Sequence, residues 1–320
     1  MDHVRGCERR APVGCVHDDR HELGQRLISL HQFHGAPLLA QKRLTILKPK
    51  IERLPDDHQS KPECLFELSR LYGWVGNQAE RKRLLTHALR LCRKRGSDHY
   101  VAQTLREISD ANREMGLYKE GMELAREGSE ISGRLGDTVE QAHCLILLAM
   151  LLRREKQFDA AEEVASRAIH LLPEKGEQYM VCYAHHVLGV IYQYKGETVK
   201  AIHHIEVALG IASSFDWQSE LFWIHSGLAD LFLGEGRPDD ANTHAEQAKS
   251  HAADSPYSLG CAMKQQASVW CWEQRFEEAR SEVMRAAEVF EKLGAAKEVK
   301  ECREVLQNIQ MQLDNQAISG

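Results

Sequence analysis

The chain has 320 residues, of which 43% are hydrophobic and 28% are charged, and its net charge is −6. This composition supports a buried core, so intrinsic disorder and a collagen-like structure are excluded. The acidic balance argues against a dedicated nucleic-acid-binding protein, which would be basic.

The N-terminal region lacks a clear pattern. Residues 1–19 are expected to form a disordered tail, and their acids and arginines without an apolar run do not resemble a secretory signal. Residues 20–54 look like a degenerate N-terminal helical pair with a turn at Gly35 and a small residue at Ala40. We expect Pro49 to interrupt the second helix of that pair.

Small residues recur about every forty positions through the rest of the chain. They form three columns, and each unit contributes one residue to each column. The six units contribute, in order, Ser69, Arg81 and Ala88; Ser109, Gly121 and Gly128; Ala149, Ala161 and Ala168; Gly189, Ala201 and Ala208; Ala229, Ala241 and Ala248; and Ala267, Ala279 and Ala286. All but Arg81 are Ala, Gly or Ser, where average composition predicts roughly a quarter. Small side chains let two helices approach to the usual separation of about 8–10 Å. The columns therefore predict close helix crossings.

A bulky column and a turn column follow the same period. The bulky column holds Tyr72, Leu152, Tyr192, Phe232 and Trp270, with Asn112 as the exception. The turn column holds Gly76, Gly116, Gly196 and Gly236, with Lys156 and Gln274 in place of glycine. Apolar residues on both sides of each turn are spaced by three and four, which indicates two antiparallel helices per unit.

These columns, as in LGVIYQYKGETVKAI at 188–202, resemble the tetratricopeptide repeat (TPR). The forty-residue period is similar to the longer-helix variety of kinesin light chains. Residues 77–89, 109–117, 159–178 and 289–299 resemble the C-terminal TPR region of fungal NLR-like, STAND-type proteins, which carry an NB-ARC or NACHT ATPase. The resemblance implies an all-α fold, a right-handed α-α superhelical solenoid of helix-turn-helix repeats with a C-terminal capping helix.

The repeat sets the expected domain organisation. We expect six TPR-like repeats over 55–293, a capping helix over 294–314 and a disordered tail over 315–320. The nine cysteines form no C-x-x-C pair, so they are interpreted as buried thiols in a reducing compartment. The longest apolar run, 144–152, is about half the length of a membrane span. A cytoplasmic protein is the expectation.

Candidate chemistry is sparse. The histidines His185–His186 and His203–His204 suggest a metal site, but adjacent helix positions point about 100° apart. His185 and His225 are equivalent in successive units, which favours a structural role. No P-loop, nucleophile elbow or dinucleotide fingerprint occurs. We therefore expect no catalysis, no cofactor and no metal.

Basic residues gather in one stretch. They are Arg81, Lys82, Arg83, Arg90, Arg93, Lys94 and Arg95, preceded by Lys42, Arg43, Lys48 and Lys50. They could contact an anionic partner or phosphate, or they could be balanced by acids of neighbouring units. We favour the second interpretation.

The first helix of each unit is expected to line the concave groove of the solenoid. By register with the TPR family, the groove candidates are Arg106, Asp110, Arg113, Ile146, Met150, Arg153, Tyr183, His186, Val190, Tyr194, Trp223 and Asp230. Aromatic residues, Met and Arg are enriched in interface cores. The alternative is that some of them pack between units. The lysine and asparagine clamp of chaperone-binding relatives is not matched, because those positions hold Phe66, Arg70, Arg106 and Asp110.

The favoured function is a non-catalytic scaffold that binds a peptide or protein in this groove. Nucleic acid and membrane are not expected as partners. The alternative is a sensor or autoinhibitory region of a STAND-type signalling ATPase, in contact with an NB-ARC or NACHT module within the same chain or in trans. RNA binding is a third hypothesis, which the acidic balance opposes.

Overall fold

The structure is a computed structural model that describes residues 36–173, 176–252, 255–293 and 295–319. All of them belong to the compact unit His34–Gly320. The described residues form fourteen helices and no strand. The expected tail at 1–19, the start of the N-terminal pair and its turn at Gly35 lie outside the described residues.

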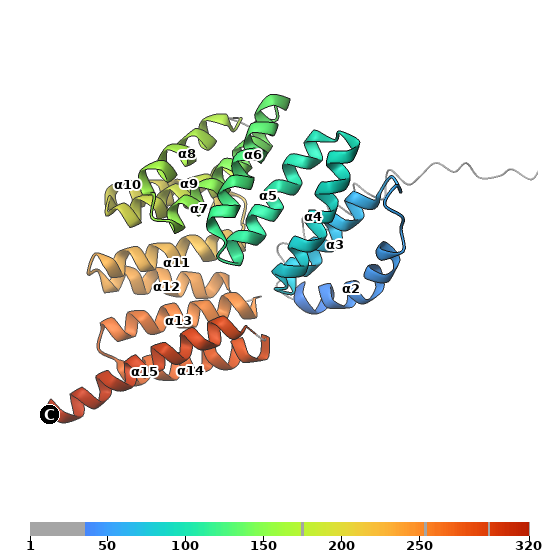
Figure 1. Ribbon diagram of the computed structural model, residues 1–320. Coiled ribbons are helices and arrows are strands. Elements are labelled where there is room, and N and C mark those ends of the chain that lie inside the picture. The colour runs from blue at the N-terminus through green and yellow to red at the C-terminus, as the bar shows by residue number, and fades with distance from the viewer. Residues whose placement is uncertain (1–35, 174–175, 253–254, 294, 320) are drawn as a thin grey trace, which may run out of the picture. The chain divides into compact units, whose positions relative to one another are not determined.

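The helices follow one another with short turns between them (Figure 1). They are α2 (Ala36–Glu52), α3 (Lys61–Trp74), α4 (Gln78–Arg95), α5 (Asp98–Glu114), α6 (Tyr118–Leu135), α7 (Thr138–Arg154), α8 (Phe158–Leu171), α9 (Gln178–Lys195), α10 (Thr198–Ser214), α11 (Gln218–Gly234), α12 (Pro238–His251), α13 (Pro256–Trp272), α14 (Phe276–Leu293) and α15 (Ala296–Ser319).

From α3 to α14 the helices pack as six consecutive pairs, and α15 covers the last pair. The first helices of successive pairs also contact each other, from α5 to α7, α9, α11 and α13. This arrangement confirms the predicted fold class, a right-handed α-α solenoid of TPR-like helix pairs with a C-terminal capping helix. The row of first helices forms one surface, on which most of the candidate binding residues lie.

The three small columns lie at the helix crossings, and all eighteen positions are buried. At Gly189 an added Cβ would lie 2.5 Å from Cγ1 of Ile205, so no larger residue fits without movement. Arg81 is buried like the small residues of its column, although its side chain is long. The small columns are therefore explained by close approach of helices, as predicted.

The turn column is also explained by backbone geometry. Gly76, Gly116, Gly196 and Gly236 all have positive φ values, between 71° and 77°. Lys156 and Gln274, which replace glycine in this column, have a φ of 60°. Both residues therefore adopt the left-handed conformation that favours glycine.

Two terminal expectations were wrong. Pro49 lies inside α2, which continues to Glu52. The proline is close to the end of the helix, and Ala40, Leu44 and Ile51 still bury their side chains in the cluster formed with α3 and α4. At the other end, α15 extends to Ser319 through the stretch expected to be disordered. That stretch contains no helix-breaking residue before Gly320.

Candidate partner-binding surface

The candidate groove residues lie on four first helices, α5, α7, α9 and α11. We call their accessible side chains the first-helix surface. It comprises Arg106, Asp110, Arg113, Met150, Arg153, Tyr183, His186, Val190, Tyr194, Trp223 and Asp230, all of them half-buried or exposed.

Ile146 is the exception, and its assignment to the groove needs correction. Its side chain is only 1% exposed and belongs to the central hydrophobic core. Every residue from Cys144 to Ala149 is buried, so this part of α7 is apolar on all sides. Such a helix gives no periodic signal for the face that is exposed. Ile146 therefore stabilises the core and does not contribute to the first-helix surface.

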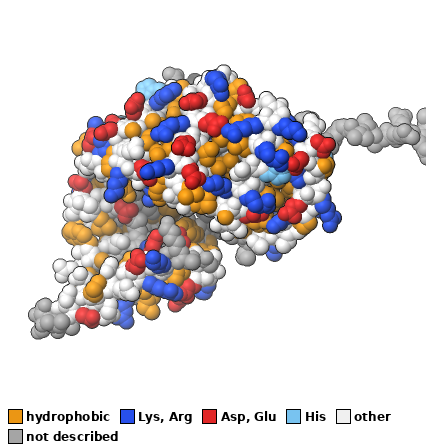
Figure 2. Space-filling model, in the orientation of Figure 1, with side chains coloured by type: hydrophobic (Ala, Val, Ile, Leu, Met, Phe, Trp, Pro, Cys, Tyr) orange, Lys and Arg blue, Asp and Glu red, His pale blue; other side chains and the backbone are white. Residues whose placement is uncertain are grey.

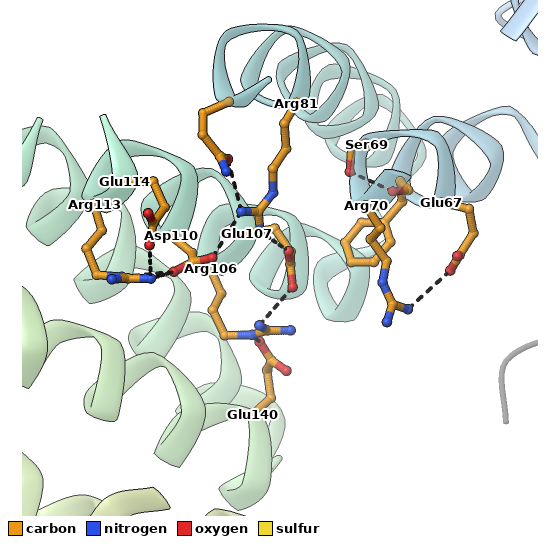
Figure 3. A network of polar contacts seen from close by, with 12 residues as sticks. Glu67, Ser69, Arg70, Arg81, Arg106, Glu107, Asp110, Arg113, Glu114 and Glu140 are labelled. Atoms are coloured by element: carbon orange, nitrogen blue, oxygen red, sulfur yellow. Dashed lines mark hydrogen bonds and ion pairs between the residues drawn. The ribbon is translucent and has the colours of Figure 1, made fainter. Parts of the chain in front are cut away.

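The α5 part of the surface is a network of ion pairs (Figure 3). Arg81 of α4 donates to Glu107 at 2.5 Å and to Asp110 at 3.0 Å. Arg106 donates to Glu107 at 2.9 Å and to Glu140 of α7 at 2.8 Å. The network therefore joins three helices that belong to three successive pairs.

The end of α5 and the start of α7 complete this network. Arg113 donates to Asp110 at 2.9 Å and is also paired with Glu114. Asp137 caps α7 by accepting the backbone N–H of Glu140 at 3.0 Å, which fixes the residue that Arg106 contacts. Three predicted binding residues thus have internal partners and hold the helices together.

The charges of this network influence one another strongly. Burial opposes the ionisation of Glu107, but the attraction of Arg106 and Arg81 outweighs it and lowers the pKa of Glu107 to about 2. Burial raises the pKa of Glu140 in spite of its contact with Arg106. The three arginines face four carboxylates, those of Glu107, Asp110, Glu114 and Glu140. The network is therefore close to electrically balanced by itself.

The adjoining part of the surface, on α7 and α9, is more aromatic. The Tyr183 hydroxyl donates to Sδ of Met150 at 3.1 Å. The guanidinium of Arg153 lies 5.1 Å from the ring centroid of Tyr194, whose other neighbour is the stacked ring of Phe158 at 5.9 Å. Tyr194 is 58% exposed. This part offers a cation and accessible aromatic faces to a partner.

His186 connects this part to α11. Burial, together with the charge of Arg153, lowers the pKa of His186 to about 4, so its ring is neutral at pH 7. Its Nε2 lies 3.7 Å from the place where a Cβ on Gly227 would lie. On α11, Trp223 is 45% exposed, and Asp230 accepts a hydrogen bond from Gln265 of α13 at 2.5 Å.

Sequence reasoning missed an aromatic cluster beside α9. Trp217 packs between Phe215, at 4.8 Å, and Tyr179, at 5.4 Å between ring centroids. Tyr179 also stacks on Tyr183 at 6.5 Å, so the cluster is continuous with the first-helix surface. Phe215 and Trp217 lie in the turn between α10 and α11, and neither residue belongs to a repeat column. The signal in the sequence was the pair of aromatic residues flanking Asp216.

The basic residues of α4 are mostly balanced by internal partners, as the favoured interpretation predicted. Lys82 pairs with Glu120 and Arg93 with Glu127, both on α6. Arg90 pairs with Asp56 at 2.7 Å, and Arg95 donates to three backbone carbonyls of residues 56–59. Figure 2 shows basic and acidic side chains interspersed on the visible face. The hypothesis of a phosphate contact on α4 loses its main support.

Four histidines form two equivalent pairs, one between α9 and α10 and one between α11 and α12. Nδ1 of His185 lies 2.9 Å from Nδ1 of His204, and Nδ1 of His225 lies 3.0 Å from Nδ1 of His244. His204 stacks on Tyr192 at 5.4 Å. These contacts support the predicted structural role. Within the described ranges, no group of three or more His, Cys, Asp or Glu residues is placed to hold a metal ion.

The cysteines of the described helices do not pair with one another. Burial raises the pKa of Cys182 to about 12 and that of Cys261 to about 11, so both thiols are protonated at pH 7. Among the helices that the structure describes, none combines the length and the apolar character of a membrane span.

Comparison with solved structures shows the fold. The chain is similar to a Rap protein that was crystallised in complex with Competence and Sporulation Factor, with 16% identity, a TM-score of 0.63, and coverage of 86% of this chain and 81% of that one. It is similar to the apo form of the quorum sensor NprR from B. thuringiensis, with 13% identity, a TM-score of 0.60, and coverage of 92% and 95%. It is also similar to BtubC (BKLC) from P. vanneervenii, with 18% identity, a TM-score of 0.54, and coverage of 70% and 91%.

The comparisons at the level of sequence are negative. No protein-family model matches the chain, and no curated protein matches it. At these low identities the structural likeness establishes a TPR-like solenoid.

Proposed function

We propose that this protein is a non-catalytic scaffold that binds a peptide or protein segment on the first-helix surface. The observation that carries the proposal is the continuity of accessible aromatic and arginine side chains across successive first helices. Arg153 of α7, Tyr183 and Tyr194 of α9, and Trp223 of α11 all belong to this surface. Aromatic and arginine side chains contribute most of the binding energy in protein interfaces.

The likeness to known structures is consistent with this proposal. The Rap protein was crystallised with Competence and Sporulation Factor, and NprR is described as a quorum sensor. That the present chain binds a peptide or protein segment is our proposal. A cytoplasmic location belongs to the same proposal. The role as a sensor region in contact with an NB-ARC or NACHT module stays a prediction, since no comparison bears on it.

The proposal is tested by selecting peptides from a random display library on the immobilised protein. The Tyr194→Ala/Trp223→Ala double variant should bind the selected peptides at least tenfold more weakly by fluorescence anisotropy, since each anchor contributes on the order of 1 kcal/mol or more. Both side chains are about half exposed, so the variant should retain its melting temperature. Met284→Ala is the control, because Met284 is 49% exposed but lies on a second helix, α14.

Recovery of no peptide, or equal binding by the double variant and the control, would refute the first-helix surface as the binding site.

A further inference from the structure

Arg153 differs from the other arginines of the first-helix surface. Arg106 and Arg113 each contact two carboxylates, whereas Arg153 has no carboxylate partner among the described residues. Its guanidinium lies over the ring of Tyr194, 5.1 Å from the centroid. Burial and the nearby charges of Arg154 and Arg113 lower the pKa of Arg153, as expected for a half-buried cation without a counter-ion.

The groups around Arg153 do not neutralise it. Arg113, on the neighbouring α5, repels it, and the acids beside Arg113 are already engaged with that residue. His186 on α9 is neutral at pH 7, and its own pKa is depressed by Arg153. An uncompensated cation in a partly desolvated place is unfavourable by itself, and it becomes favourable when a binding partner supplies the opposite charge.

Apolar and aromatic groups flank this cation. Met150 lies one turn before Arg153 on α7 and accepts the hydrogen bond of Tyr183. Tyr194 is exposed and stacks on Phe158, and both rings line an open hollow together with Gln157, Lys195 and Asp159, whose carboxylate is paired with Lys195. A side chain that follows an acidic residue in a peptide could therefore lie against an aromatic wall.

We propose that Arg153 binds the carboxylate of an Asp or Glu side chain within an extended segment of the partner, while a neighbouring aliphatic or aromatic side chain packs on Tyr194 and Phe158. This inference rests on the proposed function, since it specifies the chemistry of the segment bound on the same surface. Arginine suits this role because its planar guanidinium can donate two parallel hydrogen bonds to one carboxylate.

The test uses peptides selected from a random display library on the wild-type protein. We expect an acidic residue at one position, beside an apolar residue. Arg153→Gln should weaken binding of a selected peptide about 10- to 100-fold, the range for a hydrogen bond between charged groups. Replacing the peptide's acid by its amide should weaken binding to the wild type equally, and the two changes together should cost no more than either alone.

Two further variants sharpen this test. Arg153→Glu should bind a peptide in which the acid is replaced by Lys better than it binds the original peptide. Arg154→Gln is the matched control, because it removes the same charge from the adjacent, exposed position of α7 and should change affinity less than about twofold.

The outcomes separate this inference from the proposed function. Selected peptides that lack an acidic preference, or that bind Arg153→Gln within twofold of the wild type, would overturn the role of Arg153 and leave the scaffold function standing. Loss of binding on amidation of the peptide's C-terminus, with no effect of internal acids, would overturn the assignment to a side chain. Binding that also resists the Tyr194→Ala/Trp223→Ala change would refute the first-helix surface as the binding site, and with it the proposed function.

Discussion

Two regions of the solenoid share one architecture but fill it with different chemistry. In the α4–α7 region, the small column admits Arg81, which is held by Glu107 and Asp110. In the α9–α12 region, the small columns hold only Gly and Ala, and the polar groups packed between the helices include the two histidine pairs. The comparison teaches that a helix crossing limits how much space a side chain can occupy, but it admits a charged residue such as Arg81 when carboxylates of the next pair contact it.

The histidine pairs show this most clearly. Their two positions, nineteen residues apart, are apolar in the three preceding units: Leu65 and Leu84, Leu105 and Leu124, Leu145 and Val164, then His185 and His204, His225 and His244. In each pair the two rings pack against each other, and their Nδ1 atoms share one hydrogen bond. Their burial lowers the pKa of His185 and of His225 to about 4, which keeps them neutral at pH 7.

The largest effect is expected from a substitution that breaks the ion-pair network of the α4–α7 region. Glu107→Gln leaves Arg81 and Arg106 without their shared carboxylate, and we expect the free energy of unfolding to fall by about 3–5 kcal/mol, measured by urea denaturation. Glu127→Gln is the control, because Glu127 pairs with Arg93 at an exposed site and should cost less than about 1 kcal/mol. Equal effects of the two variants would show that the α5 network contributes no more than a surface pair.

The second prediction concerns a substitution in the same region that removes the side-chain amide of Asn112, which has no hydrogen-bond partner. Both polar atoms of the Asn112 side chain are buried without a hydrogen-bond partner, while the equivalent residue in the next unit is Leu152. Asn112→Leu should therefore raise the free energy of unfolding by about 1–3 kcal/mol in the same assay. Leu152→Asn, the reciprocal variant, should lower it. A loss of stability in Asn112→Leu would contradict the assignment of an unsatisfied amide.

The third prediction tests the buried histidine pairs of the α9–α12 region by pH. His225 has an ordinary pKa of 6.5 and a folded-state pKa of about 4. Between these values the unfolded chain binds a proton that the folded chain does not, so stability falls as pH drops through this window. We expect His225 to account for about 1–2 kcal/mol of the loss between pH 7 and pH 5. His225→Leu should remove that share in urea denaturation at the two pH values.

Glu107 should not contribute in this window, because its pKa lies near 2. His170→Leu, at an exposed position of α8, is the control for replacing a histidine by leucine. An unaltered pH profile in His225→Leu would contradict the neutral buried pair.

The smallest effects are expected from substitutions at equivalent turns of two successive units. Lys156 has a φ of 60°, whereas Gly196 supplies the same turn in the next unit. Lys156→Gly should raise the free energy of unfolding by about 0.5–1 kcal/mol, because a side chain in the left-handed region is strained. Gly196→Ala should lower it by about 1 kcal/mol in thermal melts. If Lys156→Gly were destabilising, unfolded-state entropy would outweigh the strain.

The sequence determined the local architecture of this protein. The small columns predicted the helix crossings, and the turn column predicted the tight turns, at which the structure shows positive φ for the glycines and also for Lys156 and Gln274. These features are local, since they depend on contacts within one helix pair that is repeated along the chain. Pro49 and the C-terminal stretch were assigned wrongly because neighbouring helices, or the lack of any breaker, outweighed propensity.

Only the tertiary structure decided which candidate side chains are available to a partner. Ile146 is buried because α7 is surrounded by its neighbours, and Arg106 is engaged because Glu140, 34 residues away, reaches it from the next first helix. Arg153 is distinguished from Arg113 solely by the acids that other residues place near each of them. Pairing of charges between helices far apart in the chain is not encoded in a forty-residue period, so it becomes visible only once the helices have packed.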